Sequence, residues 1–322
     1  MENNPRPAVI FDGDWSGQLV ATAIHTGHDL RPEVAEAMIL DEDTRLREED
    51  PHTDEIARLA PARVVVNRSR FEVDLNRLRE DAVYRTPADC WDLEVWRKSP
   101  LDDAIVERSR EVYESFYEQL AVHLDEVARR GPFVVYDVHS YNHRRDGAQS
   151  APEPEEDNPE VNLGTGTVDR DVFQPVVDAF TETMKEQQTD GGPLDVRENV
   201  KFEGRALAWW IHERYAGRGV CLALEFKKTF MNEWTGEVDH TRLRQLQEAL
   251  AATHAPVLAA LAQIAGDPAP LERTAAGAQA APTAEPGQVD NAEHVGGVGI
   301  QEDVRMPADP GLWGSRRGAP DS

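Results

Sequence analysis

Two histidines and a glutamate each follow a short apolar run, a position in which catalytic and metal-binding side chains are often found. His25 follows the run GQLVATAI, His139 follows PFVVYDV, and Glu225 follows RGVCLAL. Such runs, rich in β-branched residues, predict buried strands. Ligands of α/β proteins collect at the carboxyl ends of strands, so we expect the three side chains at one edge of a sheet. Two histidines and one carboxylate are a common ligand set for catalytic zinc, and a further glutamate nearby could act as general base.

A purely structural interpretation of these residues is also open. Asp137 and His139 could simply close their strand and hydrogen-bond nearby loops, because a histidine at a strand end is only a probabilistic signal of a site. Glu225 must be paired, hydrogen-bonded or protonated if it is buried, and Lys227 or Lys228 could supply the partner.

Acidic and basic groups lie between the first and the second of these runs. Asp50 precedes Pro51, which predicts a helix start with Asp50 as a plain N-cap. The next predicted strand, 63–67, leads into a polar cluster: Arg68, Arg70, Asp74, Asn76 and Arg77. Arginine is suited to binding carboxylates through two hydrogen bonds, although a solvated, salt-bridged loop would have the same composition. Together these residues favour metal-assisted hydrolysis of an acidic substrate.

Composition limits the class of protein. The 322 residues carry a formal net charge of −26, from 60 acidic and 34 basic side chains. This balance argues against nucleic acid and against an anionic membrane surface as partners. Two cysteines make no disulfide framework, and we find neither a signal peptide nor a spanning segment, so a cytoplasmic location is expected. Only five of the basic residues are lysine, for which a salt-adapted host and an arginine-rich genome remain equal explanations.

Periodicity predicts alternating strands and helices, which is typical of an α/β domain. Strands are predicted at 17–24, 63–67, 133–136 and 218–225, with a short extended stretch at 196–202. Helices are predicted at 32–40, from Asp50–Pro51, and at 103–130, 171–185, 204–215 and 240–264. Irregular loops are expected at 84–101 and 146–169. We expect one domain over 1–265 and a disordered tail over 266–322, because the tail has few bulky apolar residues.

Five segments resemble, in order, those of the N-formylglutamate amidohydrolase family. They are IHTG at 24–27, DPHTD at 50–54, SRFEVDLNR at 69–77, DVHS at 137–140 and LEFKKTFM at 224–231. The resemblance spans roughly residues 18–235, and VDLNR followed by DVHSY is also similar to the wider zinc carboxypeptidase clan. It implies a three-layer α/β/α fold in which helices cover a central mixed sheet, as in zinc carboxypeptidases and phosphorylase/hydrolase-like proteins.

The resemblance also implies a role for each matching residue. His25 and His139 would bind one zinc ion, with Asp50 as third ligand and Asp54 as its rival. Glu225 would take a proton from the attacking water and pass it to the leaving nitrogen. Three residues would bind the substrate carboxylate or polarise the scissile carbonyl: Arg70, Asn76 and Arg77.

Two departures from the family pattern concern the third ligand and the substrate. The clan's peptidases have a glutamate three residues after the first ligand, whereas this chain has His28 there. The arginine typical of the family after the catalytic glutamate is a lysine here. The implied activity is zinc-dependent cleavage of an N-acyl acidic amino acid such as N-formyl-L-glutamate, a small anionic substrate. The alternatives are a carboxypeptidase, another acyl-amino acid deacylase, or a non-catalytic protein that binds an acidic metabolite.

Overall fold

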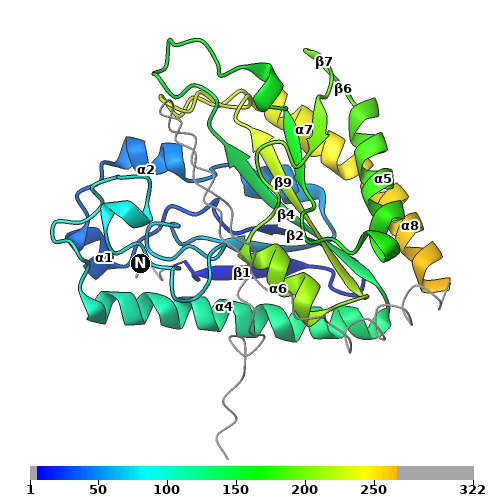
Figure 1. Ribbon diagram of the computed structural model, residues 1–322, viewed down its shortest axis with the longest axis horizontal. Helices are drawn as coiled ribbons and strands as arrows, with labels where there is room; N and C mark the ends of the chain where they lie inside the picture. The colour runs from blue at the N-terminus through cyan, green and yellow to red at the C-terminus, as the bar shows by residue number, and fades with distance from the viewer. Residues whose placement is uncertain (1–5, 267–322) are drawn as a thin grey trace, which may run out of the picture. The chain divides into compact units, whose positions relative to one another are not determined.

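Seven strands form one mixed sheet in the computed structural model, which describes residues 6–266 (Figure 1). Their order across the sheet is β1-β3-β2-β4-β9-β5-β8. The strands are β1 (Val9–Gly13), β2 (Leu19–Ala23), β3 (Ala62–Val66), β4 (Phe133–Tyr141), β5 (Val161–Gly164), β8 (Val196–Glu198) and β9 (Gly219–Lys227). β3, β2, β4 and β9 are parallel neighbours, whereas β1 and β5 run antiparallel to β3 and β9. A separate small hairpin consists of β6 (Gln188–Thr189) and β7 (Gly192–Pro193).

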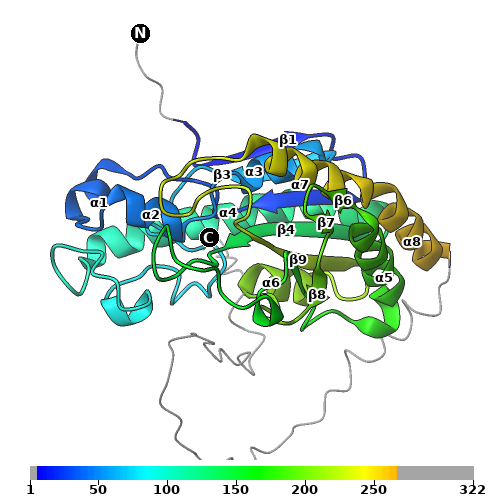
Figure 2. The ribbon, with the colours of Figure 1, turned by 90° about the horizontal axis from the view of Figure 1, so that it is seen from above.

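Helices cover both faces of this sheet. They are α1 (Pro32–Ala37), α2 (Glu42–Glu48), α3 (Thr53–Ile56), α4 (Asp103–Arg130), α5 (Arg170–Glu186), α6 (Ala206–Arg214), α7 (His240–Ala252) and α8 (His254–Gly266). The long helix α4 runs along one side of the sheet, and α5, α7 and α8 lie on the other (Figures 1 and 2). The predicted three-layer α/β fold with a mixed central sheet is therefore confirmed.

The central strand β4 shows why the layers form. All nine of its residues are buried, which is typical of a parallel strand covered on both faces. Val134, Tyr136 and Val138 belong to the apolar cluster that includes α5, α7 and α8. The alternate residues point the other way, where the Phe133 ring packs against Tyr215 at the end of α6, with centroids 5.1 Å apart. His139 therefore shares the face of the sheet that α6 covers.

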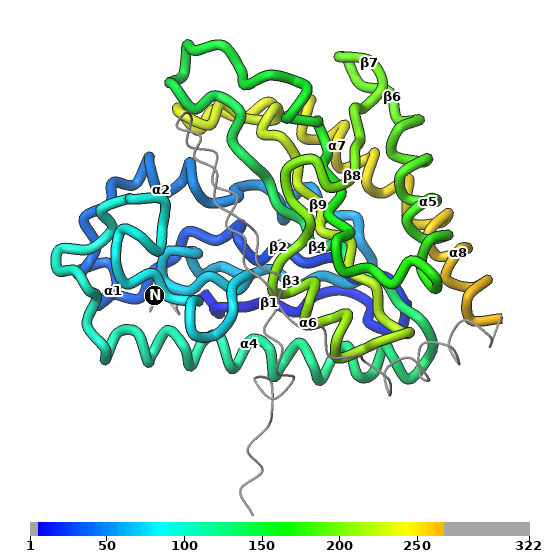
Figure 3. The backbone as a smooth tube through the Cα atoms, viewed as in Figure 1, coloured from blue at the N-terminus to red at the C-terminus, as the bar shows by residue number. Residues whose placement is uncertain are grey.

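The irregular segment 67–101 lies beside α1 and α2, as Figure 3 shows. Its buried side chains form a second, smaller apolar cluster with those of α1. The predicted covering loop at 84–101 is thus observed, apart from a short 3-10 helix at Pro87–Asp89. This segment begins directly after β3, so it stands near the carboxyl ends of the parallel strands.

By length and composition alone, the stretch His240–Gly266 is apolar enough to cross a membrane. In the structure it is interrupted at Thr253, between α7 and α8, so the single predicted helix is wrong in this detail. Its apolar side chains pack into the main core: Leu243, Leu246, Leu250, Val257, Leu261 and Ile264. It is therefore a pair of core helices.

The structure corrects four other sequence predictions. The edge strand β1 was not predicted, and β5 falls within the stretch expected to be a loop. β4 and β9 continue to Tyr141 and Lys227, so His139 lies within its strand rather than after it, and Glu225 lies before the end of its strand rather than at the end. The helix expected from Asp50 begins only at Thr53. The tail prediction, beyond Gly266, concerns residues outside the described range and stays a prediction.

Candidate metal centre and active site

His25, Asp50 and His139 meet in one buried cluster. One potential ligand atom from each lies within 4.8 Å of the others, and all three residues are at most 3% exposed. His25 follows β2 by two residues, and His139 lies in the neighbouring parallel strand β4. The backbone N–H of Asp50 donates to the carbonyl of His25 at 3.0 Å, which ties the intervening loop to the strand end. Segments from three parts of the chain thus converge on one point.

Both histidines present the same nitrogen to Asp50. Oδ2 of Asp50 lies 3.4 Å from Nδ1 of His25 and 3.1 Å from Nδ1 of His139. Each Nε2 faces a further carboxylate, Asp74 at 2.8 Å from His25 and Asp137 at 2.9 Å from His139. A carboxylate on the second nitrogen fixes the tautomer and the ring orientation of metal-binding histidines. Sequence analysis gave neither aspartate this role, although Asp137, two residues before His139, must share its face of the strand.

The cluster fits a zinc ion by its chemistry and spacing. The Nδ1 atom of His25 is buried and has no hydrogen-bond partner among residues 6–266, which is uncommon for a buried polar atom. Nitrogen and carboxylate ligands about 2.0–2.1 Å from a tetrahedral zinc ion lie roughly 3.4 Å apart. The distances of 3.4 and 3.1 Å from Asp50 to the histidines are close to this value.

The buried acidic and basic groups of the cluster shift one another's pKa. Burial alone would raise the pKa of Asp50, but a hydrogen bond with His139 and the charges of His25 and His139 outweigh burial and hold it well below its usual range. Burial lowers the pKa of His139, but Asp137 and Asp50 more than compensate and raise it well above its usual range. Burial likewise opposes ionisation of Asp74, but Arg70 and His25 hold its pKa well below normal. Asp50 and Asp74 are thus kept ionised, as metal-binding and histidine-orienting carboxylates must be.

Glu225 lies beside this cluster on the next strand. It is the direct partner of His139 in the parallel pairing of β4 with β9, so both side chains point to the same face of the sheet. Burial raises the pKa of Glu225 to about 8, with Asp50 and Asp137 adding to the effect and His139 opposing it. Within the described part of the chain, its carboxylate takes part in no ion pair or hydrogen bond. A partly buried, unpaired carboxylate with a pKa near neutrality can accept and return a proton.

The lysines proposed as structural partners of Glu225 bind elsewhere. Lys227 donates to the carbonyl of Asn158 at 2.7 Å. Lys228 donates to two backbone carbonyls and to the side chain of Asn142. The structural interpretation of Glu225 as a lysine ion pair is therefore wrong.

Neither rival for the third ligand position reaches the cluster. Asp54 accepts a hydrogen bond from Thr26 at 2.7 Å. His28 uses Nδ1 to contact Glu49 at 2.5 Å and Nε2 to contact Arg45 at 2.6 Å. The N-cap interpretation of Asp50 is also wrong, because the residue preceding α3 is His52, in a left-handed conformation with φ 67°.

Some side chains of the polar cluster after β3 bind one another. Arg70 donates to Asp74 at 2.7 Å, and Nε of Arg77 lies 3.7 Å from the same carboxylate. The side-chain amide nitrogen of Asn76 lies 3.4 Å from Nε2 of His139. The three predicted substrate-binding residues therefore lie around the histidines. Arg70 and Arg77 also neutralise Asp74, the carboxylate that contacts His25.

Lys228 joins the three loops of the site, a function that sequence reasoning missed. Its side chain is 1% exposed, and Nζ donates to the carbonyls of Arg47 and Glu49 at 2.6 and 2.7 Å and to Oδ1 of Asn142 at 2.9 Å. These partners precede Asp50 and follow His139, whereas Lys228 itself follows Glu225. All three protons of the ammonium group are used, so the side chain fixes these segments relative to one another.

Replacement of Lys228 by methionine should therefore weaken both stability and metal binding. Methionine fills similar volume but leaves two carbonyls and an amide oxygen buried without a donor, which costs on the order of 2–4 kcal/mol of unfolding free energy. Chemical denaturation would measure this loss, and zinc titration against a chromophoric chelator would measure affinity. Lys228→Arg, which keeps the charge, should recover part of both; unchanged stability and zinc affinity in Lys228→Met would contradict the assigned role.

Known proteins similar to this chain point to one family. The sequence model of the N-formylglutamate amidohydrolase family matches residues 17–231. A comparison with curated proteins finds no match. Among solved structures, N-formylglutamate amidohydrolase from Ralstonia eutropha JMP134 superposes with a TM-score of 0.65 at 18% identity, covering 80% of this chain and 98% of that chain. The gene product Atu2144 from Agrobacterium tumefaciens superposes with a TM-score of 0.54 at 17% identity, covering 80% and 96%.

At these identities the two solved structures show that the fold is shared. The family match is independent evidence from the sequence. It begins before His25 and ends after Glu225, so it contains every candidate residue of the cluster. It also confirms the resemblance drawn from the five motifs. The chain belongs to the N-formylglutamate amidohydrolase family, a family of hydrolases.

Proposed function

We propose that this protein is a zinc-dependent amidohydrolase that removes the formyl group from an N-formyl acidic amino acid such as N-formyl-L-glutamate. The observation that carries the proposal is the buried His25–Asp50–His139 cluster with Glu225 directly beside it, in a chain of the amidohydrolase family. Two histidines and a carboxylate leave a fourth position for water at a zinc ion, as in catalytic sites.

In this proposal His25, Asp50 and His139 hold the metal. When bound, zinc would supply Lewis-acid activation of water and of the scissile carbonyl. Glu225 accepts the proton of the attacking water and delivers it to the leaving nitrogen, which its raised pKa of about 8 makes easier than for an ordinary glutamate. Asp74 and the strand neighbour Asp137 keep the two histidines oriented.

Substrate contacts come from the polar segment after β3. Asn76 lies beside His139, and Arg70 and Arg77 share Asp74 close to His25, so in this proposal the three side chains border the reacting end of the substrate. Guanidinium and amide donors stabilise the negative charge that develops on the carbonyl oxygen. The same positive groups favour a small anionic substrate.

The free thiols Cys90 and Cys221 agree with the proposed cytoplasmic location.

The test is turnover and metal content of the purified full-length chain. We expect about one zinc ion per chain, the stoichiometry of a single catalytic site, and release of formate from N-formyl-L-glutamate. Exhaustive chelation should abolish turnover, and added zinc should restore it. A panel including N-acetyl amino acids and carboxyl-terminal dipeptides separates a deformylase from another deacylase or a carboxypeptidase. A protein that binds L-glutamate equally well after chelation, with no turnover on any substrate, would be a binding protein and would overturn the proposal.

A further inference from the structure

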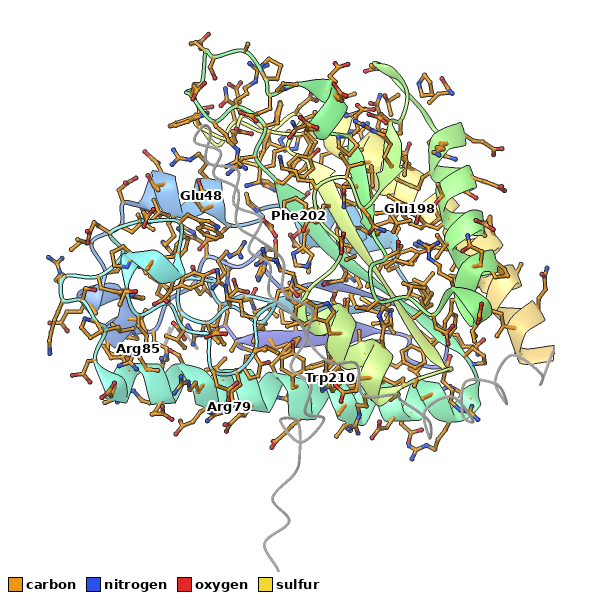
Figure 4. All side chains as sticks on the ribbon, in the orientation of Figure 1. Glu48, Arg79, Arg85, Glu198, Phe202 and Trp210 are labelled. Carbon is orange, nitrogen blue, oxygen red and sulfur yellow. The ribbon has the colours of Figure 1, made fainter. Side chains whose placement is uncertain are left out.

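Arg205 ends a segment that leads into α6 and is fastened beside the strand that carries Glu225. This segment includes Phe202, labelled in Figure 4, and ends at Arg205, the residue immediately before the helix. Oδ1 of Asn162 accepts the backbone N–H of Val200 at 3.0 Å, and the Asn162 side chain donates to the carbonyl of Phe202 at 2.8 Å. Asn162 is in turn the partner of Glu225 in the pairing of β5 with β9. The segment is therefore fastened to the strand position that faces Glu225.

A second contact fastens the start of α6 to the metal cluster. The backbone N–H of Leu207, two residues after Arg205, donates to Oδ1 of Asn76 at 3.2 Å. Asn76 also lies 3.4 Å from Nε2 of His139. Burial raises the pKa of Glu225, and the positive charge of Arg205 is among the groups that oppose this rise. Arg205 thus stands within electrostatic reach of Glu225, on a different element from the other arginines of the site.

Arg205 differs from the other arginines of the site because no carboxylate forms an ion pair with it in the described residues. Arg70 and Arg77 both interact with Asp74. Arg205 is partly buried, yet across residues 6–266 its side chain forms no hydrogen bond, ion pair or ring contact. A buried nitrogen without a hydrogen-bond partner would be an orphaned polar atom, and Arg205 has no such atom. Its guanidinium nitrogens are therefore accessible to solvent. The other arginines that lack a partner within the described range are exposed at the surface: Arg6, Arg58, Arg145, Arg218 and Arg244.

We propose that Arg205 binds the side-chain carboxylate of the acidic substrate and thereby selects glutamate-like over neutral amino acids. The inference rests on the proposed function, in which Arg70, Asn76 and Arg77 serve the reacting end near the histidines. An N-formyl acidic amino acid carries a second carboxylate, and a free guanidinium on the α6 side of Glu225 can receive it through two parallel hydrogen bonds. Within the described residues no carboxylate forms an ion pair or hydrogen bond with Arg205, so its N–H groups can donate to a ligand.

The test compares Arg205→Gln with wild type on N-formyl-L-glutamate and on its neutral isostere N-formyl-L-glutamine. A charge-assisted hydrogen bond contributes about 1.5–3 kcal/mol, so kcat/KM for the glutamate substrate should fall about 10- to 100-fold, mainly through KM. The glutamine substrate should change by less than about threefold. Arg205→Lys, which keeps the charge but loses the fork geometry, should recover part of the loss. Arg244→Gln, which removes an exposed arginine from α7, is the matched control for net charge.

Equal losses on both substrates, or unchanged kcat/KM on N-formyl-L-glutamate, would overturn the assignment. Failure of the proposed function is a separate result: the wild type would then hydrolyse none of the N-acyl amino acids. In that case calorimetric binding of L-glutamate and L-glutamine to wild type and Arg205→Gln decides the inference. Loss of glutamate binding in the variant alone supports it, and equal or absent binding in both proteins rejects it.

Discussion

Replacing Glu225 by glutamine is expected to reduce kcat by roughly 10²–10⁴-fold, because general acid–base catalysis contributes a factor of this size. Glutamine keeps the shape of the side chain but cannot accept the proton of the attacking water. It is not one of the three cluster residues that converge on the candidate metal position, so zinc content should stay at the wild-type value. Formate release under saturating substrate and atomic absorption on the same sample measure the two quantities together.

The pKa of Glu225 supplies an internal check that the variant is folded. Burial raises this pKa from 4.5 to about 8, so in chelated protein the folded state favours the protonated form. The stability that comes from binding this proton is fully present below the unfolded pKa and is lost as pH rises from about 4.5 towards 8. Glutamine has no proton to lose, so chelated Glu225→Gln should unfold at the same or a higher temperature than chelated wild type at pH 8.

A matched control is Glu213→Gln, an exposed position on α6, which should leave kcat unchanged. A Glu225→Gln protein with wild-type turnover would remove Glu225 from the mechanism. A variant that is inactive because it has lost zinc or unfolded would move its role from catalysis to structure.

Local patterns were enough to predict the elements whose burial is simple. The helix α4 begins and ends where its apolar spacing and the final Arg129-Arg130-Gly131 indicate, at Asp103 and Arg130. The strand β2 is buried at every position, which its continuous apolar run predicts. Strand ends in an α/β sheet are close in space, so the convergence of His25 and His139 also followed from the sequence.

Features that depend on pairing with distant segments were not predictable in the same way. β1 is a partly exposed edge strand held by β3, and its own residues have no clear alternation. β5 has only four residues, and its place beside β9 is set by non-local pairing. β4 extends through the polar residues Asp137, His139 and Ser140 because β9 pairs with it over nine positions. Polar residues within a strand look like a loop until the partner strand is known.

The candidate site shows the same division. Sequence motifs gave the histidines and Glu225, but only the fold distinguishes Asp50 from Asp54, since a loop fastened to His25 turns one carboxylate inwards. Arg205 lies outside the five motifs, and the motif that contains Lys228 does not show that its side chain joins segments that are far apart in the chain. Whether a charged side chain forms an ion pair depends on its neighbours in the fold, and amino-acid composition does not show these neighbours.

His139→Ala is expected to abolish zinc binding and, with it, catalysis. This change removes one of the three ligands and leaves Asp50 and Asp137 without the imidazole that lies between them. Because ligands that bind only the folded state stabilise it, saturating zinc should raise the melting temperature of wild type but not of the variant. Zinc content after dialysis and thermal unfolding with and without zinc are the measurements.

Two further variants make this result specific to the cluster. His240→Ala removes an exposed histidine at the start of α7 and should keep one zinc ion per chain. Asp137→Asn keeps the ligand but changes the group that orients it, so zinc affinity should fall by about 10- to 100-fold rather than vanish. Zinc affinity should therefore be highest in wild type, lower in Asp137→Asn and lowest in His139→Ala. This order follows if His139 binds the metal through Nδ1 while Asp137 contacts Nε2. Full zinc content in His139→Ala would place the metal elsewhere and remove the basis of the hydrolytic mechanism.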